Sequence, residues 1–230
     1  MKEKVAFFLP TRKGSERVKN KNTKPFAGIE GGLVENKVKQ LLATKLIDEI
    51  IFSSNDDVCM EVVGKYKDSR LKIIERPTEL CLSTTNLQDL ICYVPTVTDA
   101  GHILWGHVTT PLCDADQYDA GVKLYFDKLQ EGYDSLVGVT ELKNFLLNKY
   151  GKLINNTTDI PWPRTQDLEA LYPINHTMFL AKREVYTKQK NRIGEKPLLY
   201  IMDELHSFDI DWPDDFVIAE IMYKNLYGNK

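Results

Sequence analysis

The chain has 230 residues, 43% of them hydrophobic and 27% charged, and its formal net charge is −3. This composition fits one large globular domain and argues against a broadly basic nucleic-acid surface. No apolar run approaches the roughly 20 residues of a membrane helix, and the N-terminus lacks a signal-peptide core. Four cysteines without a C-x-x-C pair are typical of free thiols, so we expect a cytoplasmic protein with no membrane contact.

The first predicted element is a buried strand at residues 5–9, and a basic loop follows it. Pro10 and Gly14 prevent the strand from continuing. Six cations in this loop face a single acid, Glu16: Arg12, Lys13, Arg17, Lys19, Lys21 and Lys24. Backbone N–H groups and the Ser15 hydroxyl can bind anionic oxygens while the cations neutralise their charge. The pattern indicates a nucleotide-triphosphate site, and the alternative is a solvated charged turn.

Helices and strands then alternate along most of the chain. Helical spacing predicts helices near 33–43, 56–64, 85–94, 116–129, 182–189 and 214–226, with N-caps at 54–56 and 83–85. Short apolar runs predict strands at 49–53, 71–75, 102–108, 134–139, 178–181 and 198–202. This order predicts an α/β fold of three layers with a mostly parallel sheet. Because active sites of such sheets gather at the carboxyl ends of strands, the basic loop, Arg76, Thr109, Thr110 and Asp114 should share one edge.

The alternation stops between about residues 140 and 174. This segment contains Gly151, an Asn-Asn pair and three prolines, with only short apolar runs between them. We expect it to be an inserted arm, a lid or an oligomer contact within a single domain that spans residues 1–230.

A bound triphosphate also needs a divalent cation, which prefers carboxylate ligands. Asp209 and Asp211 flank Ile210 in an extended run, so both carboxylates lie on one side and form the predicted metal site. Asp114 and Asp116 begin a helix, where Asp114 suits the N-cap position. The acids that follow Asp211 leave a helix-start cluster as the alternative.

Two further features point to a substrate. Arg164 and Gln166 place a fork-shaped cation beside an amide, which suggests an acidic substrate, although a surface arginine is the alternative. His107, at the end of the fourth predicted strand, is the histidine that we single out. The chain lacks G-x-G-x-x-G, G-x-x-x-x-G-K-[ST] and G-x-S-x-G, so dinucleotide binding, a Walker-type ATPase and an esterase lack their usual support.

Several motifs resemble those of the acylneuraminate cytidylyltransferases, the CMP-sugar synthetases that activate sialic, legionaminic and pseudaminic acids. Residues 10–22, P-T-R-K-G-S-E-R-V-K-N-K-N, resemble the family pattern P-A-R-x-G-S-K-R-x-x-x-K-N. Residues 209–220, D-I-D-W-P-D-D-F-V-I-A-E, resemble D-I-D-x-x-x-D-F-x-x-A-E. Supporting matches in the same order are Phe52–Asn55, Arg76–Leu80, Thr109–Leu112, Tyr133–Val137, Pro163–Asp167 and Asn175–Phe179.

The resemblance implies a Rossmann-like nucleotidyltransferase of cell-surface polysaccharide biosynthesis. The anomeric hydroxyl of a 2-keto sugar acid would attack the α-phosphorus of CTP, with Mg²⁺ as cofactor, and the arm would form a homodimer. The resemblance assigns Arg12, Gly14, Ser15, Lys21, Asn22, Arg76 and Thr85 to the nucleotide, and Asp209 and Asp211 to the metal. It assigns His107, Thr110, Arg164, Gln166, Asn175 and Phe179 to the sugar, and Arg12, Lys21 and Asp211 to catalysis.

The chain departs from the family pattern mainly on the sugar side. His107 stands where the family has Gln, and His176-Thr177 replace Gly-Ala, whereas the CTP side differs only by small changes such as Asn55 for Asp. The motifs therefore predict cytidylyl transfer without identifying the sugar. The residues leave three alternatives open: a KDO or phosphonate-like acceptor, a D-x-D glycosyltransferase, and a non-enzymatic protein whose basic loop binds RNA or an acidic partner.

Overall fold

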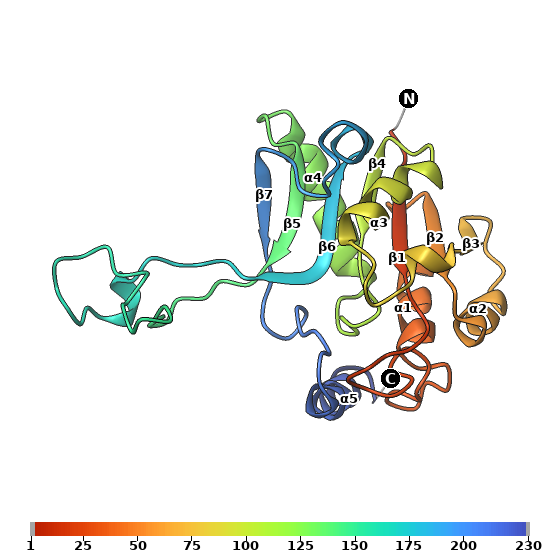
Figure 1. Ribbon diagram of the computed structural model, residues 1–230, viewed down its shortest axis with the longest axis horizontal. Coiled ribbons are helices and arrows are strands. Elements are labelled where there is room, and N and C mark those ends of the chain that lie inside the picture. The colour runs from red at the N-terminus through yellow and green to blue at the C-terminus, as the bar shows by residue number, and fades with distance from the viewer. Residues whose placement is uncertain (1–2, 229–230) are drawn as a thin grey trace.

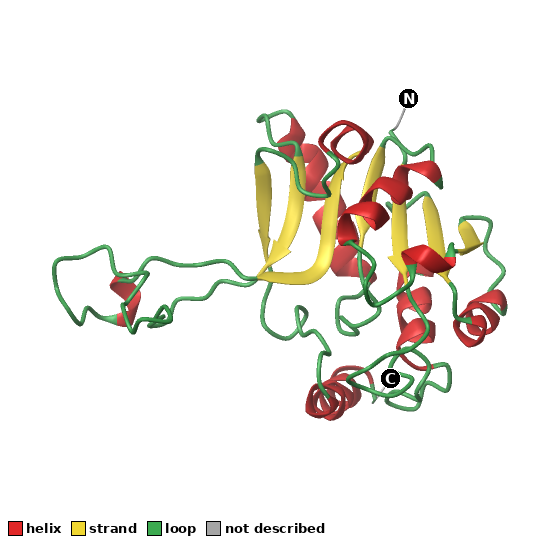
Figure 2. Ribbon diagram, viewed as in Figure 1, coloured by secondary structure: helices red, strands yellow, loops and turns green. Residues whose placement is uncertain are grey.

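The computed structural model describes residues 3–228, which build one seven-stranded sheet (Figures 1 and 2). Its strands are β1 (Val5–Pro10), β2 (Glu49–Ser54), β3 (Leu71–Glu75), β4 (His102–Trp105), β5 (Ser135–Val139), β6 (Ile174–Lys182) and β7 (Pro197–Ile201). Their order is β3-β2-β1-β4-β6-β5-β7, and only β6 runs antiparallel to its neighbours. The predicted α/β fold with a mostly parallel sheet is confirmed.

Helices cover both faces of the sheet because both sets of alternating side chains in the strands are apolar. In β1, Val5, Phe7 and Leu9 belong to one core cluster, and Ala6 and Phe8 belong to the other. The first cluster includes side chains from α1 (Gly32–Leu42), α2 (Asp57–Gly64), α4 (Ala115–Leu129) and α5 (Pro213–Tyr227). The second includes side chains from α3 (Leu87–Tyr93) and from the short helical turns η2 (Val94–Thr96) and η4 (Val185–Gln189). No helix in the described part of the chain is long and apolar enough to cross a bilayer.

Most predicted elements are present, but three differ. The predicted cap at 83–85 is wrong, because α3 begins at Leu87 and the Asn86 side chain accepts the Gln88 N–H at 3.0 Å. The predicted strand 102–108 ends at Trp105, after which the chain leaves the sheet. The predicted helix 182–189 is a π-helical turn, since β6 continues to Lys182.

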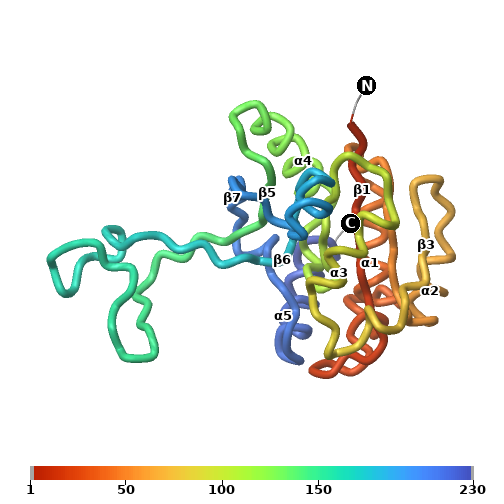
Figure 3. The backbone as a smooth tube through the Cα atoms, turned by 45° about the horizontal axis from the view of Figure 1, so that its top comes forward, coloured from red at the N-terminus to blue at the C-terminus, as the bar shows by residue number. Residues whose placement is uncertain are grey.

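The arm, defined here as residues 140–173, joins β5 to β6 and extends away from the sheet (Figures 1 and 3). The buried Asn155 amide holds its chains together by donating to the carbonyls of Asn144 and Glu169 at 2.8 and 3.1 Å. Six of its large hydrophobic side chains are exposed: Leu147, Tyr150, Ile154, Ile160, Trp162 and Tyr172. A segment that exposes this much apolar surface is typical of a contact with another molecule.

Candidate active site

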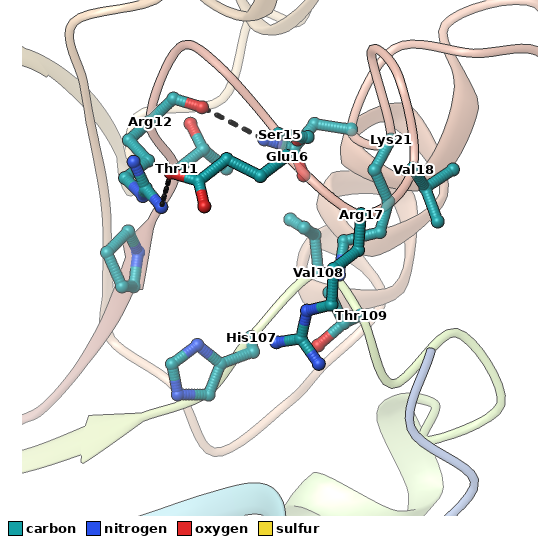
Figure 4. Close-up of a pocket in the computed structure, with 12 residues that line it drawn as sticks. Thr11, Arg12, Ser15, Glu16, Arg17, Val18, Lys21, His107, Val108 and Thr109 are labelled. Carbon is teal, nitrogen blue, oxygen red and sulfur yellow. Dashed lines mark hydrogen bonds and ion pairs between the residues drawn. The ribbon is translucent and has the colours of Figure 1, made fainter. Parts of the chain in front are cut away.

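A cavity of about 290 Å³ opens at the carboxyl ends of β1 and β4 (Figure 4). The basic loop, residues 11–22, lines one part of it, and residues 107–109 line another. The lining residues are Pro10, Thr11, Arg12, Ser15, Glu16, Arg17, Val18, Lys21, Asn22, His107, Val108 and Thr109. The expectation that the basic loop and Thr109 meet at one edge of the sheet is confirmed.

Neighbouring strand ends hold the basic loop in shape. Gly14 has a φ of +85°, the left-handed conformation that glycine adopts without strain. The Asn55 side chain after β2 accepts the Lys13 N–H at 3.0 Å. At the far end of the loop, Asn22 donates from Nδ2 to the Arg12 carbonyl at 3.4 Å and accepts the Val34 N–H at 2.9 Å. The loop therefore presents its cations from a backbone that is already ordered.

Three residues predicted to bind the nucleotide do not line the cavity: Gly14, Arg76 and Thr85. Arg76 is 3% exposed and lies beneath the loop, where its guanidinium donates to the carbonyls of Thr11 at 2.6 Å and Ser53 at 3.3 Å. The Thr85 hydroxyl donates to the Glu79 carbonyl at 2.7 Å. Because the Arg76 guanidinium donates to these carbonyls, Arg76 links the ends of β1 and β2 and has a structural role.

The segment 209–211 lies against the same cavity. The Ile210 N–H donates to the Thr109 carbonyl at 2.9 Å, and the Ile210 carbonyl accepts from Lys21 Nζ at 2.8 Å. Ile210 is fully buried and anchors the segment in the core. Burial lowers the pKa of Lys21, and the neighbouring carboxylates of Asp209 and Asp211 oppose this shift. The structure thus joins two sequence motifs that lie almost 190 residues apart.

The two carboxylates of this segment fit a divalent cation. Asp209 Oδ1 is buried and has no hydrogen-bond partner among the described residues, and burial raises the pKa of this carboxyl group. Asp211 Oδ1 accepts from Arg17 Nη1 at 2.9 Å. A buried oxygen without a partner costs free energy that a bound cation would recover. Mg²⁺ commonly takes only one or two protein carboxylates and completes its shell with phosphates and water.

Three of the residues predicted to bind the sugar, Thr110, Asn175 and Phe179, are buried next to other residues of the core. Thr110 is buried, and its hydroxyl donates to the His107 carbonyl at 3.1 Å, so it positions His107. Asn175 Oδ1 accepts from the Thr177 hydroxyl at 2.7 Å, whereas Asn175 Nδ2 is buried without a partner among the described residues. Phe179 lies in the core of β6, 1% exposed. None of these three lines the cavity directly.

Arg164 and Gln166 lie in the arm, within the short turn region around η3 (Thr165–Asp167), far from the cavity of their own chain (Figures 1 and 2). Arg164 pairs with Asp167 at 2.8 Å, and its side chain is 76% exposed. The structure therefore does not bring these two residues to this cavity, because the arm projects away from the sheet.

The sequence interpretation missed Lys37 of α1, which holds the loop after β4. This lysine is fully buried, and Nζ donates to the carbonyls of Thr110 at 2.8 Å and Cys113 at 2.7 Å and to the Tyr118 hydroxyl at 2.9 Å. Burial lowers the pKa of Lys37 to about 8. Its place three residues after Val34, within the apolar stripe of the helix, was the available signal.

Comparisons with known proteins bear on this site. No protein-family model matches the chain. It is 26% identical over 229 residues to an N-acylneuraminate cytidylyltransferase of Escherichia coli, covering 95% of this chain and 52% of that protein. It is 22% identical over 237 residues to a pseudaminic acid cytidylyltransferase of Campylobacter jejuni, covering 94% of each. The chain is therefore similar, over most of its length, to cytidylyltransferases that act on N-acylneuraminic and pseudaminic acids. It spans about half the length of the Escherichia coli relative.

Solved structures agree with the family in fold. CMP:2-keto-3-deoxy-manno-octonic acid synthetase, complexed with CTP, has a TM-score of 0.67 and 11% identity and covers 97% of this chain and 99% of its own. The 4-diphosphocytidyl-2C-methyl-D-erythritol synthase of Anaerococcus prevotii also has a TM-score of 0.67 and 11% identity, covering 96% of this chain and 99% of its own. The fold is therefore the Rossmann-like nucleotidyltransferase fold.

Two residues that differ from the cytidylyltransferase pattern, His107 and His176, lie beside each other. Burial lowers the pKa of His107 to about 3, helped by the charges of Arg192 and His176, so this ring is neutral near pH 7. The His176 ring lies 6.1 Å from it, and His176 has a φ of +59°. A non-glycine residue rarely adopts this backbone conformation, and the family pattern has Gly at this position. The replacement therefore places a second imidazole beside His107 in a backbone conformation that glycine adopts more readily.

Proposed function

We propose that the protein is a cytidylyltransferase that joins CTP to a nonulosonic 2-keto sugar acid and releases pyrophosphate. One observation carries this proposal: segment 209–211, in which Asp209 Oδ1 is buried without a partner among the described residues, is hydrogen-bonded through Ile210 to Lys21 and Thr109, and both of these line the cavity. Cations in the cavity with carboxylates next to it match the needs of a metal-bound triphosphate. The choice of CTP and of the acid follows the cytidylyltransferases that the chain resembles.

The chain's own residues would act mainly by positioning and charge stabilisation. Arg12 and Lys21 would neutralise the α-phosphate and the departing pyrophosphate, and Ser15 and Asn22 would bind phosphate oxygens. The anomeric oxygen would form a bond to the α-phosphorus while the bond from that phosphorus to the pyrophosphate oxygen breaks. Asp209 and Asp211 would hold Mg²⁺, which orients the triphosphate and polarises its oxygens. The partly buried setting of Lys21 strengthens its interaction with phosphate.

The homodimer also belongs to the proposal. The exposed apolar side chains of the arm suit a contact with a second copy, and Arg164 lies too far from its own cavity to meet a sugar there. In a dimer built through the arms, Arg164 and Gln166 would approach the cavity of the other copy. Light scattering on the purified protein should give twice the monomer mass, and Trp162→Ser with Tyr150→Ser should shift that mass toward the monomer. A monomeric wild-type protein would contradict this part of the proposal.

A pyrophosphate-release assay tests the reaction itself. The assay contains CTP, Mg²⁺ and, in turn, N-acetylneuraminic, pseudaminic and legionaminic acids and KDO. We expect pyrophosphate release from CTP with at least one nonulosonic acid and with no sugar nucleotide added, which excludes a D-x-D glycosyltransferase because that enzyme needs a sugar nucleotide as donor. Absence of release with every acid at saturating Mg²⁺ would refute the proposed function. We place this reaction in the cytoplasm, in keeping with four free cysteines.

A further inference from the structure

An arginine outside every sequence motif stacks on Trp105, whose ring neighbours that of the cavity-lining His107. Arg192 follows η4, on the sheet face that η4 and α3 cover. Its guanidinium carbon lies 3.7 Å from the ring centroid of Phe179 and 5.0 Å from that of Trp105. Among the described residues, this guanidinium forms no ion pair and donates no hydrogen bond. It is therefore a half-buried cation that stacks on two aromatic rings.

Two buried polar groups beside Arg192 also lack partners. Trp105 Nε1 and the Tyr186 hydroxyl have no hydrogen-bond partner among the described residues, and the two residues are 1% and 0% exposed. Tyr186 belongs to the same buried cluster as Trp105, and the charge of Arg192 lowers the pKa of its hydroxyl, against the burial that raises it. Arginine and tryptophan side chains can only donate hydrogen bonds, and a tyrosine hydroxyl can also donate. Three unsatisfied donors in one place indicate a ligand that presents oxygen acceptors.

The charge balance of this side of the cavity favours an anionic ligand. His107 is neutral, and Arg164 lies in the arm. Arg12 and Lys21 belong to the triphosphate side in the proposed function. The Trp105 ring on which Arg192 stacks lies 6.2 Å, centroid to centroid, from the ring of His107, so the positive charge lies near the wall where the acceptor would bind. An acidic acceptor needs a cation there, and Arg192 supplies one.

The segment that carries Arg192 is firmly attached to β5. The Asp134 carboxylate accepts the N–H groups of Glu195 and Lys196 at 2.7 and 3.1 Å, and the Ser135 hydroxyl accepts the Gly194 N–H at 2.8 Å. This attachment orders the backbone around Arg192 before any ligand arrives. Preorganisation of this kind lowers the entropy cost of binding.

We propose that Arg192 is a specificity-determining residue that receives the carboxylate of the acceptor sugar, with the Tyr186 hydroxyl and the Trp105 N–H as further donors beside it. The inference rests on the proposed function, because the acceptor class comes from that function. Aromatic stacking fixes the plane of the guanidinium, which leaves its edge for the two oxygens of a carboxylate.

The first experiment compares steady-state kinetics of three variants with N-acetylneuraminic and pseudaminic acids. Arg192→Met keeps the packing against Phe179 but removes the charge, and we expect the acceptor KM to rise roughly 10- to 100-fold. The KM for CTP should stay unchanged. Arg192→Lys should be intermediate, because it keeps the charge but loses the fork. Lys188→Met, which removes an exposed cation from η4, is the matched control and should have wild-type constants. An unchanged acceptor KM in Arg192→Met would overturn the proposal.

The second experiment measures binding without turnover and separates this proposal from the proposed function. Calorimetry compares each acid with its C1 amide, using the wild-type protein and Arg192→Met in the presence of a non-hydrolysable CTP analogue. We expect the wild type to prefer the acid and the variant to bind both alike, with amide affinity unchanged. A wild-type protein that binds acid and amide equally overturns the role of Arg192, whether or not pyrophosphate is released. A retained acid preference without pyrophosphate release would refute the proposed reaction and leave Arg192 as an anion receptor.

Discussion

Lys37→Met tests whether a buried lysine holds the loop that forms one wall of the cavity. The substitution keeps a side chain of similar length but removes the donor that serves the carbonyls of Thr110 and Cys113 and the Tyr118 hydroxyl. Leaving buried acceptors unsatisfied costs about 1–3 kcal/mol each before relaxation. At pH 7 we therefore expect a lower free energy of unfolding and a weaker kcat/KM, because Thr110 in turn positions His107.

The pH dependence of the free energy of unfolding tests the role of Lys37 more directly than its value at pH 7. The pKa of Lys37 is about 8 in the folded protein against 10.5 in a model peptide. Between these values the unfolded chain binds a proton that the folded chain does not, so the Lys37 contribution to stability rises with pH. Linkage gives a rise of about 2 kcal/mol between pH 7 and pH 9.5. Below pH 8 both states are protonated, and the contribution is constant.

Urea unfolding of wild type and Lys37→Met at pH 7, 8.5 and 9.5 measures this rise. Taking the difference between the two proteins cancels other groups that titrate in the same range. The difference should grow with pH by about 2 kcal/mol. Lys39→Met is the control, because the pKa of Lys39 is raised by its contact with Glu35 and should add no rise in this range. A difference that stays flat from pH 7 to 9.5 would refute the reasoning.

Three other predictions concern the site. Asp211→Ala should lower kcat by roughly 100-fold or more, with little change in Tm, because the loss of a group that only supports a metal ligand can already cost about 100-fold. Asp116→Ala, in the other D-x-D sequence, is the control and should keep activity. A near-normal rate for Asp211→Ala at saturating Mg²⁺ would exclude the metal assignment. His107→Gln should change the relative kcat/KM among acid sugars and leave the KM for CTP unaffected; an unchanged preference would make His107 structural. Arg76→Met should reduce the free energy of unfolding by about 2–3 kcal/mol in urea titrations, since charged hydrogen bonds to two strand ends are lost, and full stability would show that these bonds contribute nothing.

The sequence by itself determined the local elements. The apolar run of β1 and the N-cap acids Asp56 and Asp114 follow rules that involve only neighbouring residues, and the structure confirms these elements. Opposite charges at the two ends of the chain, in the basic loop and at residues 209–211, also predicted a shared anion and metal site. Such predictions can be made from the sequence because they depend only on residue types at a few neighbouring positions.

Tertiary structure alone decided which partner each polar side chain meets. Arg76 and Lys37 are cations in the sequence, but in the structure both are buried and donate hydrogen bonds to carbonyls of distant segments. Arg192 differs from them in that its guanidinium meets aromatic rings. The antiparallel pairing of β6 with β4 puts Phe179 beside Trp105, and the guanidinium lies over both rings with no ion pair to an acid of the described chain. The order of strands and the reach of single side chains determine these contacts, and neither can be read from residue spacing.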